Sequence, residues 1–184
     1  MKALKTELDI LRDVSEALES AGIAFMLTGS IAMNYYAQPR MTRDIDVVMD
    51  LSASDAEKLM KLFSQDYYID REAVLRAISQ RSIFNLIHHD SVIKVDGIVR
   101  KDGPYRREEF TRKRRVTIGD FQTWIVSLED LILSKLHWAK DSRSELQLRD
   151  VRNLLRLDCD HNYLRSRAQT LGVQQLLEEI LSES

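Results

Sequence analysis

Two aspartates, Asp44 and Asp46, lie two positions apart at the start of the apolar, β-branched run "DIDVVMD". Aspartate is depleted in β-strands, so a pair within one strand needs an explanation. Side chains at positions i and i+2 of a strand point to the same face, about 6.5–7 Å apart along the chain. Two carboxylates at that separation repel each other by roughly 2–3 kcal/mol at an effective dielectric constant near 20. Water, a basic partner or a bound cation must therefore offset this repulsion.

Two further features favour a cation as the offsetting group. Gly29 and Ser30 lie between a predicted strand and a predicted helix. There the backbone can approach a ligand closely, and the N–H groups at the helix start attract anions. Asp96 is a single carboxylate in another apolar strand, "IKVDGIV". If the two strands are neighbours, three carboxylates form an oxygen-rich cluster of the kind that binds Mg²⁺, an ion that also bridges nucleotide phosphates.

Strands and helices that alternate along the first two thirds of the chain must position these residues. The pattern predicts strands in "IAFMLTG" and "DIDVVMD", a helix between them capped by Ser30, and a hairpin of "SIFNLIHH" and "SVIKVDGIV". Ser54 and Glu57 form a predicted capping box for the helix "DAEKLMKLFSQ", and Asp70 is expected to cap the next helix. "RRVTIGDFQTWIVS" predicts a second hairpin, and from Ser127 onward the pattern is helical.

Three motifs in this order resemble those of a known superfamily. They are the Gly29-Ser30 pair, the run Arg40-x-Thr42-x-Asp44-Ile45-Asp46 and a later "KVD" that ends at Asp96. Together they resemble the nucleotidyltransferases with the DNA polymerase β-like palm. The resemblance is closest to a small bacterial branch that includes the AbiEii-type toxins and is related to the antibiotic nucleotidyltransferases. It covers roughly residues 28–155. It implies an α+β fold, in which a palm domain of mixed sheet and helices (1–126) precedes a C-terminal helical bundle (127–184).

The resemblance also implies an activity and a set of site residues. The implied reaction moves a nucleoside monophosphate from an NTP to a hydroxyl group with the help of two Mg²⁺ ions, which clamp the attacking and leaving oxygens. The implied catalytic and metal-binding residues are Asp44, Asp46 and Asp96, and Asp96 would also help to deprotonate the acceptor. The implied nucleotide-binding residues are Gly29, Ser30, Arg40, Thr42 and Lys135. Lys135 lies in "SLEDLILSKLHWAKD", a stretch similar to the helical half of the family.

Plainer explanations exist for each of these residues. The Gly-Ser turn can simply cap a helix, and the aspartate pair can be solvated at an exposed strand end. Asp96 can pair with Lys94, which lies on the same strand face. Lys135 can be a solvated lysine on an amphipathic helix, and Arg40 can pair with an acidic neighbour.

Several functions remain open at this point. The acceptor hydroxyl can belong to a protein, a tRNA end or a small molecule. The chain can also be a toxin-like regulator with an antitoxin partner, or a non-catalytic nucleotide-binding module. Residues 100–115 hold eight basic and three acidic residues, which is typical of a solvated face but also of a footprint for RNA.

Length and composition limit the classes of protein to which the chain can belong. The 184 residues suggest one domain, or a small domain with an appendage, and the formal net charge of -2 gives no global signal for nucleic acid or membrane. The single cysteine, Cys159, excludes an internal disulfide. The N-terminal twenty residues lack the apolar core of a signal peptide, and no stretch approaches 18 uninterrupted apolar residues. We therefore expect a cytoplasmic protein with no membrane partner.

Overall fold

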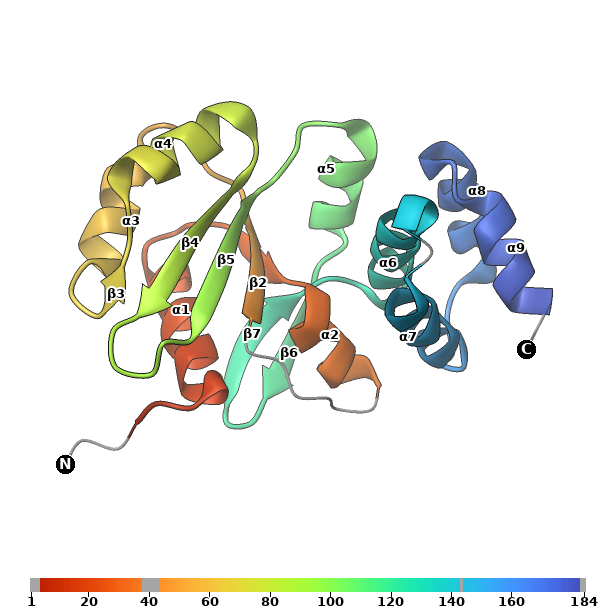
Figure 1. Ribbon diagram of the computed structural model, residues 1–184, viewed down its shortest axis with the longest axis horizontal. Helices are drawn as coiled ribbons and strands as arrows, with labels where there is room; N and C mark the ends of the chain where they lie inside the picture. Colours follow the sequence, from red (N-terminus) through yellow and green to blue (C-terminus); the bar gives the residue numbers. More distant parts are fainter. Residues whose placement is uncertain (1–3, 38–43, 143, 183–184) are drawn as a thin grey trace.

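A seven-stranded mixed sheet forms the centre of the molecule, with the strand order β3-β4-β5-β2-β1-β7-β6 (Figure 1). The structure is a computed structural model that describes residues 4–37, 44–142 and 144–182. Arg40 and Thr42 lie outside the described residues. The strands are β1 (Phe25–Leu27), β2 (Asp44–Met49), β3 (Tyr67–Tyr68), β4 (Ile83–His88), β5 (Lys94–Val99), β6 (Arg114–Ile118) and β7 (Phe121–Ile125).

The pairing of β2 sets the middle of the sheet. It pairs in parallel with β5 and antiparallel with β1, and β4 pairs antiparallel with β5 as the predicted hairpin. Ile45, Val47 and Met49 alternate along β2 and are fully buried. Because side chains alternate between the two faces of a strand, the aspartates of β2 must point to the opposite face.

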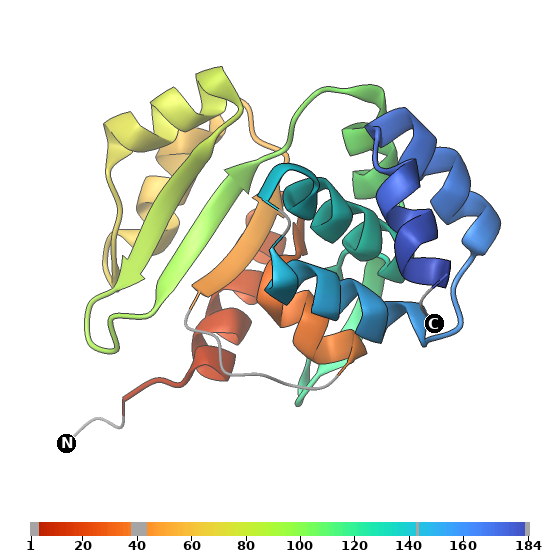
Figure 2. The ribbon, with the colours of Figure 1, turned by 45° about the vertical axis from the view of Figure 1, so that its right-hand side comes forward.

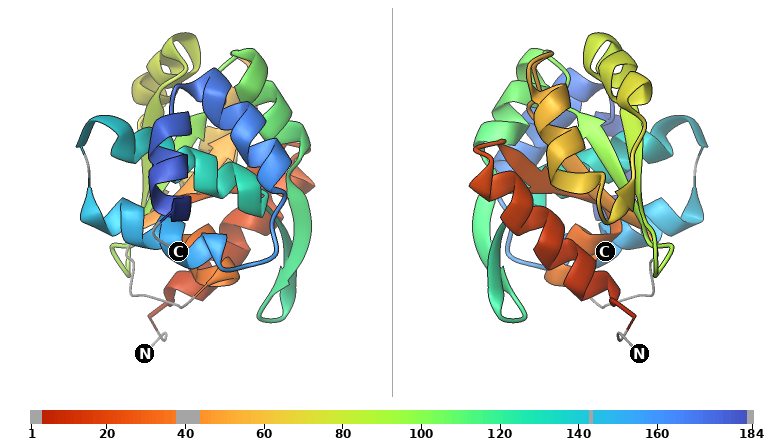
Figure 3. Two further views of the ribbon diagram at one scale, coloured as in Figure 1. Left: turned by 90° about the vertical axis from the view of Figure 1, so that its right-hand side faces the viewer. Right: turned by 90° about the vertical axis from the view of Figure 1, so that its left-hand side faces the viewer.

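Helices cover the two faces of the sheet unequally. The helices are α1 (Glu7–Ser20), α2 (Gly29–Tyr36), α3 (Asp55–Phe63), α4 (Arg71–Gln80), α5 (Pro104–Thr111), α6 (Leu128–Ser142), α7 (Glu145–Leu155), α8 (His161–Leu171) and α9 (Gln174–Ser182). Figure 3 shows α1, α3 and α4 over one face, and α2 with the later helices on the other side. The apolar stripe predicted for α1 is confirmed, because Ile10, Leu11, Val14 and Leu18 are buried.

Helices α6 to α9 pack together beside the sheet, and α2 contacts both α6 and α7 (Figures 1 and 2). The predicted α+β class is thus confirmed. The division into a palm domain (1–126) and a helical region (127–184) stays a proposal. In the described ranges, the last strand ends at Ile125. Within those same ranges, no helix is both long and apolar enough to cross a membrane.

One predicted helix start and one predicted capping box are wrong. Helix α2 begins at Gly29, and its N-cap is Thr28 rather than Ser30. The capping box of Ser54 with Glu57 does not form, because Ser54 has helical backbone angles (φ -69°, ψ -16°) and its side chain makes no capping bond. An N-cap residue usually has extended angles. The cap at Asp70 is confirmed, since its carboxylate accepts from the backbone N–H groups of the next turn.

Candidate active site

Three carboxylates lie on one face of two neighbouring strands. In the parallel register of β2 and β5, Asp46 lies opposite Asp96, and Asp44 lies opposite Lys94. Neighbouring strands are about 4.8 Å apart. The structure therefore brings together the three aspartates at which the sequence motifs pointed, on the face away from α1, α3 and α4.

Gly29 allows the start of α2 to lie directly against Asp46. Its φ of +58° is in the left-handed region, which glycine adopts without a steric penalty. A Cβ at this position would lie 2.0 Å from Oδ2 of Asp46, which is far inside van der Waals contact. The backbone N–H of Thr28 also donates to the carbonyl of Asp46 at 3.0 Å. The glycine of the Gly-Ser pair is therefore required by the carboxylate beside it.

The environment of Asp46 favours a positive partner. Burial raises the pKa of its carboxyl group above the usual value, and the charges of Asp96 and Asp44 raise it further. Lys94 and the backbone N–H of Ser30 act in the opposite direction, but the pKa remains raised. A cation at this face would relieve the remaining repulsion.

Lys94 and Asn85 already occupy part of this face. The ammonium Nζ of Lys94 lies 3.0 Å from Oδ2 of Asp96 and 3.6 Å from Oδ1 of Asp44. The side-chain amide of Asn85, on β4, donates to Oδ1 of Asp96. Sequence reasoning missed Asn85, although a polar residue that interrupts the apolar strand "SIFNLIHH" was a visible signal.

The donor set fits a hard divalent cation such as Mg²⁺, because all three side chains offer carboxylate oxygens. In the part of the chain that the structure describes, no group of three or more His, Cys, Asp or Glu side chains converges closely enough to hold a metal ion. The contacts explain this, since both oxygens of Asp96 face donors from Lys94 and Asn85.

Lys135 lies in a buried ion pair between α6 and α7. Its Nζ lies 2.7 Å from Oδ2 of Asp150 and 3.3 Å from Oε1 of Gln147, and only 5% of the residue is exposed. Its predicted role in nucleotide binding stays a prediction. It would require the ammonium to serve a phosphate while held by Asp150.

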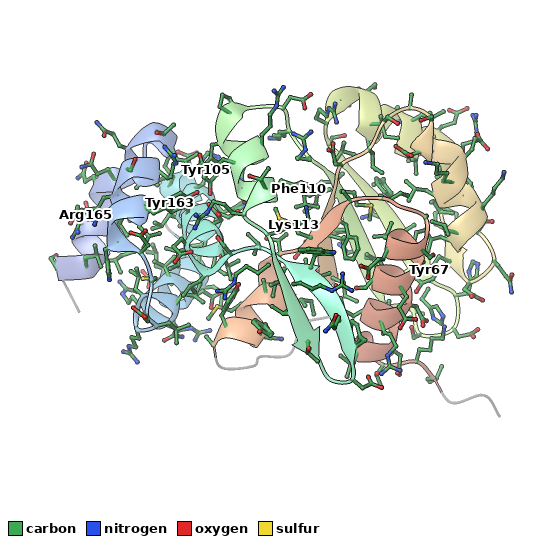
Figure 4. All side chains as sticks on the ribbon, turned by 180° about the vertical axis from the view of Figure 1, so that it is seen from behind. Tyr67, Tyr105, Phe110, Lys113, Tyr163 and Arg165 are labelled. Atoms are coloured by element: carbon green, nitrogen blue, oxygen red, sulfur yellow. The ribbon has the colours of Figure 1, made fainter. Side chains whose placement is uncertain are left out.

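A second charged cluster, which we call the Asp130 network, joins α5, α6 and α8. Asp130 is fully buried, and its carboxylate accepts from Tyr105, Tyr163, Arg112 and Ser127 at 2.6–3.1 Å. The Arg112 guanidinium also stacks on the Tyr163 ring at 3.8 Å from the ring centroid. Figure 4 shows Tyr105 and Tyr163 next to each other at this junction.

The other cations of the basic segment are largely engaged as well. Arg106 pairs with Glu109 at 2.9 Å, and Arg115 pairs with Glu19 at 2.8 Å. Lys113 lies over the Phe110 ring, 4.3 Å from its centroid (Figure 4). These contacts within the protein reduce the charge that residues 100–115 can offer to RNA.

A groove of about 590 Å³ lies away from the carboxylates, between the end of α2 and the β6–β7 hairpin. It is lined by Tyr35, Tyr36, Arg114, Arg115, Val116, Thr117 and Gln122. None of the three aspartates lines this groove, so it is not the carboxylate site.

The sequence profile of a family described as aminoglycoside-2''-adenylyltransferase matches residues 10–131, a span that includes Gly29, Ser30 and all three aspartates. The chain belongs to this family. The suspected membership of the nucleotidyltransferase superfamily is thereby confirmed, and the chain is a nucleotidyltransferase. No curated protein is significantly similar to it in sequence.

Solved structures share the fold at low sequence identity. A nucleotidyltransferase-like antigenic protein from Paracoccidioides brasiliensis has a TM-score of 0.63 at 15% identity, over 96% of this chain and 92% of that one. The complex of ANT(2'')-Ia with adenylyl-2''-tobramycin has a TM-score of 0.59 at 11% identity, over 97% and 99%. The lincomycin-bound lincosamide adenylyltransferase LnuA has a TM-score of 0.56 at 17% identity, over 81% and 96%.

Proposed function

We propose that the chain transfers a nucleoside monophosphate from an NTP to a hydroxyl group of a small molecule, with Mg²⁺ held by Asp44, Asp46 and Asp96. The observation that carries this proposal is the opposition of Asp46 and Asp96 on adjacent strands, directly beside the start of α2 at Gly29. A bound divalent cation would neutralise phosphate charge and lower the pKa of a coordinated hydroxyl.

The chain's own residues would perform the remaining steps. The first turn of α2, which begins at Gly29 and Ser30, would direct the positive end of the helix dipole toward a phosphate. Asp96 lies opposite Asp46 in the register of β2 and β5, and its carboxylate would accept the proton of an incoming hydroxyl. Asp46, held by the N–H of Ser30, fixes the carboxylate cluster against the helix start.

A small-molecule acceptor is the best supported class. The family is described by transfer to an aminoglycoside. Ile83 and Ile98 are opposite each other on the open face of β4 and β5, and Ile83 is 52% exposed. An apolar patch beside carboxylates and Asn85 suits a molecule that carries both apolar and hydroxyl groups. The engaged cations of residues 100–115 weigh against a tRNA acceptor.

The test is transfer of label from each of four α-labelled NTPs, with Mg²⁺, to a panel of acceptors. The panel contains tobramycin and other aminoglycosides, lincomycin, and total tRNA. We expect label on one class of small molecule. Asp46→Asn should reduce the transfer rate by about 100-fold or more, since metal ions supply several kcal/mol of transition-state stabilisation.

Asp90→Asn is the matched control, because Asp90 is exposed in the turn between β4 and β5 and undergoes the same chemical change. It should leave transfer unchanged. Label on tRNA alone would replace the proposed acceptor class. Transfer that survives Asp46→Asn at the wild-type rate would refute the assignment of the site.

A further inference from the structure

Lys94 places a positive charge between two of the three carboxylates, Asp44 and Asp96. It is opposite Asp44 in the register of β2 and β5, and it is two positions from Asp96 on the same strand face. Its ammonium is within 3.0 Å of one carboxylate and 3.6 Å of the other. One lysine therefore bridges the two outer members of the three-carboxylate cluster.

A divalent cation held between Asp44 and Asp96 would need the position that this ammonium takes. Metal–oxygen distances in Mg²⁺ and Ca²⁺ sites are about 2.0–2.6 Å, so a divalent ion shared by Asp44 and Asp96 cannot coexist with an ammonium between the same oxygens. The two cations must exclude each other. The side chain of Lys94 is 40% exposed and ends a flexible four-carbon stem, so it can move out into solvent.

We infer that Lys94 is a positioning residue that acts as a built-in counter-ion. In the metal-free enzyme it holds Asp44 and Asp96 together, and a divalent cation binds by displacing it. This inference rests on the proposed function, because it concerns the same carboxylates.

Asn85 determines which oxygen of Asp96 becomes available when Lys94 moves away. It donates to Oδ1 of Asp96, whereas Lys94 holds Oδ2. When Lys94 leaves, Oδ2 is released while the amide still fixes the orientation of the carboxylate. Asp96 can then turn only one oxygen toward an incoming cation.

The experiment measures Mn²⁺ binding to the nucleotide-free protein by calorimetry, with Mn²⁺ as the probe. Lys94→Met keeps the apolar stem and removes the charge, so it should raise Mn²⁺ affinity by about tenfold or more, since an adjacent unit charge no longer opposes the ion. Lys94→Arg keeps the charge and should show no gain. Lys58→Met removes a lysine that pairs with Asp55 at 2.8 Å on α3 and should also show no gain.

A thermal readout separates displacement from a merely structural ion pair. Without metal, Lys94→Met should melt a few degrees below the wild type, because two carboxylates lose their counter-ion. With saturating Mn²⁺ the difference should vanish. A melting difference that persists in Mn²⁺, or equal Mn²⁺ affinity in wild type and Lys94→Met, would overturn the inference.

Asp46→Asn in the Lys94→Met background distinguishes this failure from failure of the proposed function. Loss of Mn²⁺ binding in the double variant assigns the measured ion to the carboxylate face. If wild type and Lys94→Met bind Mn²⁺ equally and Asp46→Asn abolishes binding, only the role of Lys94 is refuted. If no variant binds Mn²⁺ even with NTP present, the proposed metal site falls together with the inference.

Discussion

The negative charge of the aspartates is compensated differently in two regions of this molecule. Asp130 is fully buried and receives hydrogen bonds from Tyr105, Tyr163, Ser127 and Arg112. Asp44 and Asp96 share one partly exposed ammonium. Every described donor around Asp130 comes from side chains packed between helices, whereas the carboxylate face of β2 and β5 is open on one side.

The difference is between a carboxylate whose charge the fold neutralises and carboxylates whose charge it neutralises only in part. Buried polar groups are stable when each acceptor is satisfied, and the Asp130 network meets this condition with four donors. The carboxylate face is under-compensated, as the raised pKa of Asp46 shows. Carboxyl groups with perturbed pKa values occur often at functional sites, which is consistent with the proposed role of this face.

The largest expected effect is on stability, and it tests whether Asp130 contributes more to the fold than the carboxylate face does. Asp130→Asn should lower the free energy of unfolding by about 3 kcal/mol, because the amide NH2 group cannot accept and leaves buried hydroxyl donors of Tyr105, Tyr163 or Ser127 unsatisfied. Asp44→Asn, the same change at the open face, should stay within about 0.5 kcal/mol of the wild type, as surface substitutions usually do. Urea unfolding of both variants makes the measurement. Equal losses would break the distinction between the two clusters.

Features that depend on local sequence were predictable, whereas contacts that depend on how the helices pack were not. The strand–turn–helix around Gly29, the aspartate pair and Asp96 were visible because period-2 alternation and a polar residue in an apolar strand are local signals. The ion pair of Lys135 with Asp150 was not visible, because it depends on how α6 packs against α7. The engagement of Arg112 with Asp130 was hidden for the same reason, and it gives one of the eight basic residues of the 100–115 segment a structural contact.

A second prediction concerns the glycine beside Asp46. Gly29→Ala should reduce nucleotidyl transfer by about tenfold or more, because the new Cβ must displace the Asp46 carboxylate from its place against α2. The flexible end of that side chain can turn away, so activity should suffer more than the fold does.

Gly22→Ala is the matched control for this change. Gly22 has a similar φ of +69°, but a Cβ there would meet no atom within 4 Å. Both alanines carry the backbone strain of a left-handed residue, about 1–2 kcal/mol. Only Gly29→Ala should also lose transfer activity, measured per folded molecule. Similar activity in the two variants would mean that Asp46 does not need its present position.

The smallest expected effect concerns Glu109, a buried carboxyl group with fewer hydrogen-bond donors than Asp130. It tests whether one partner is enough to stabilise the charged form. Glu109 on α5 is 5% exposed, close to the Asp130 network, but Arg106 is its only hydrogen-bond partner among the described residues. Burial raises the pKa of Glu109 above its usual value, although Arg106 opposes the shift. Between the usual pKa near 4.5 and the raised one, the folded state therefore binds more protons than the unfolded state. The stability contribution of Glu109 is then fully present below pH 4.5 and is lost as pH rises through that window.

Urea unfolding between pH 4 and 7 should show the wild type losing stability relative to Glu109→Gln as pH rises. A difference that grows in favour of the wild type would show that the Arg106 pair outweighs burial, and that one good partner serves a buried carboxylate as well as the four around Asp130.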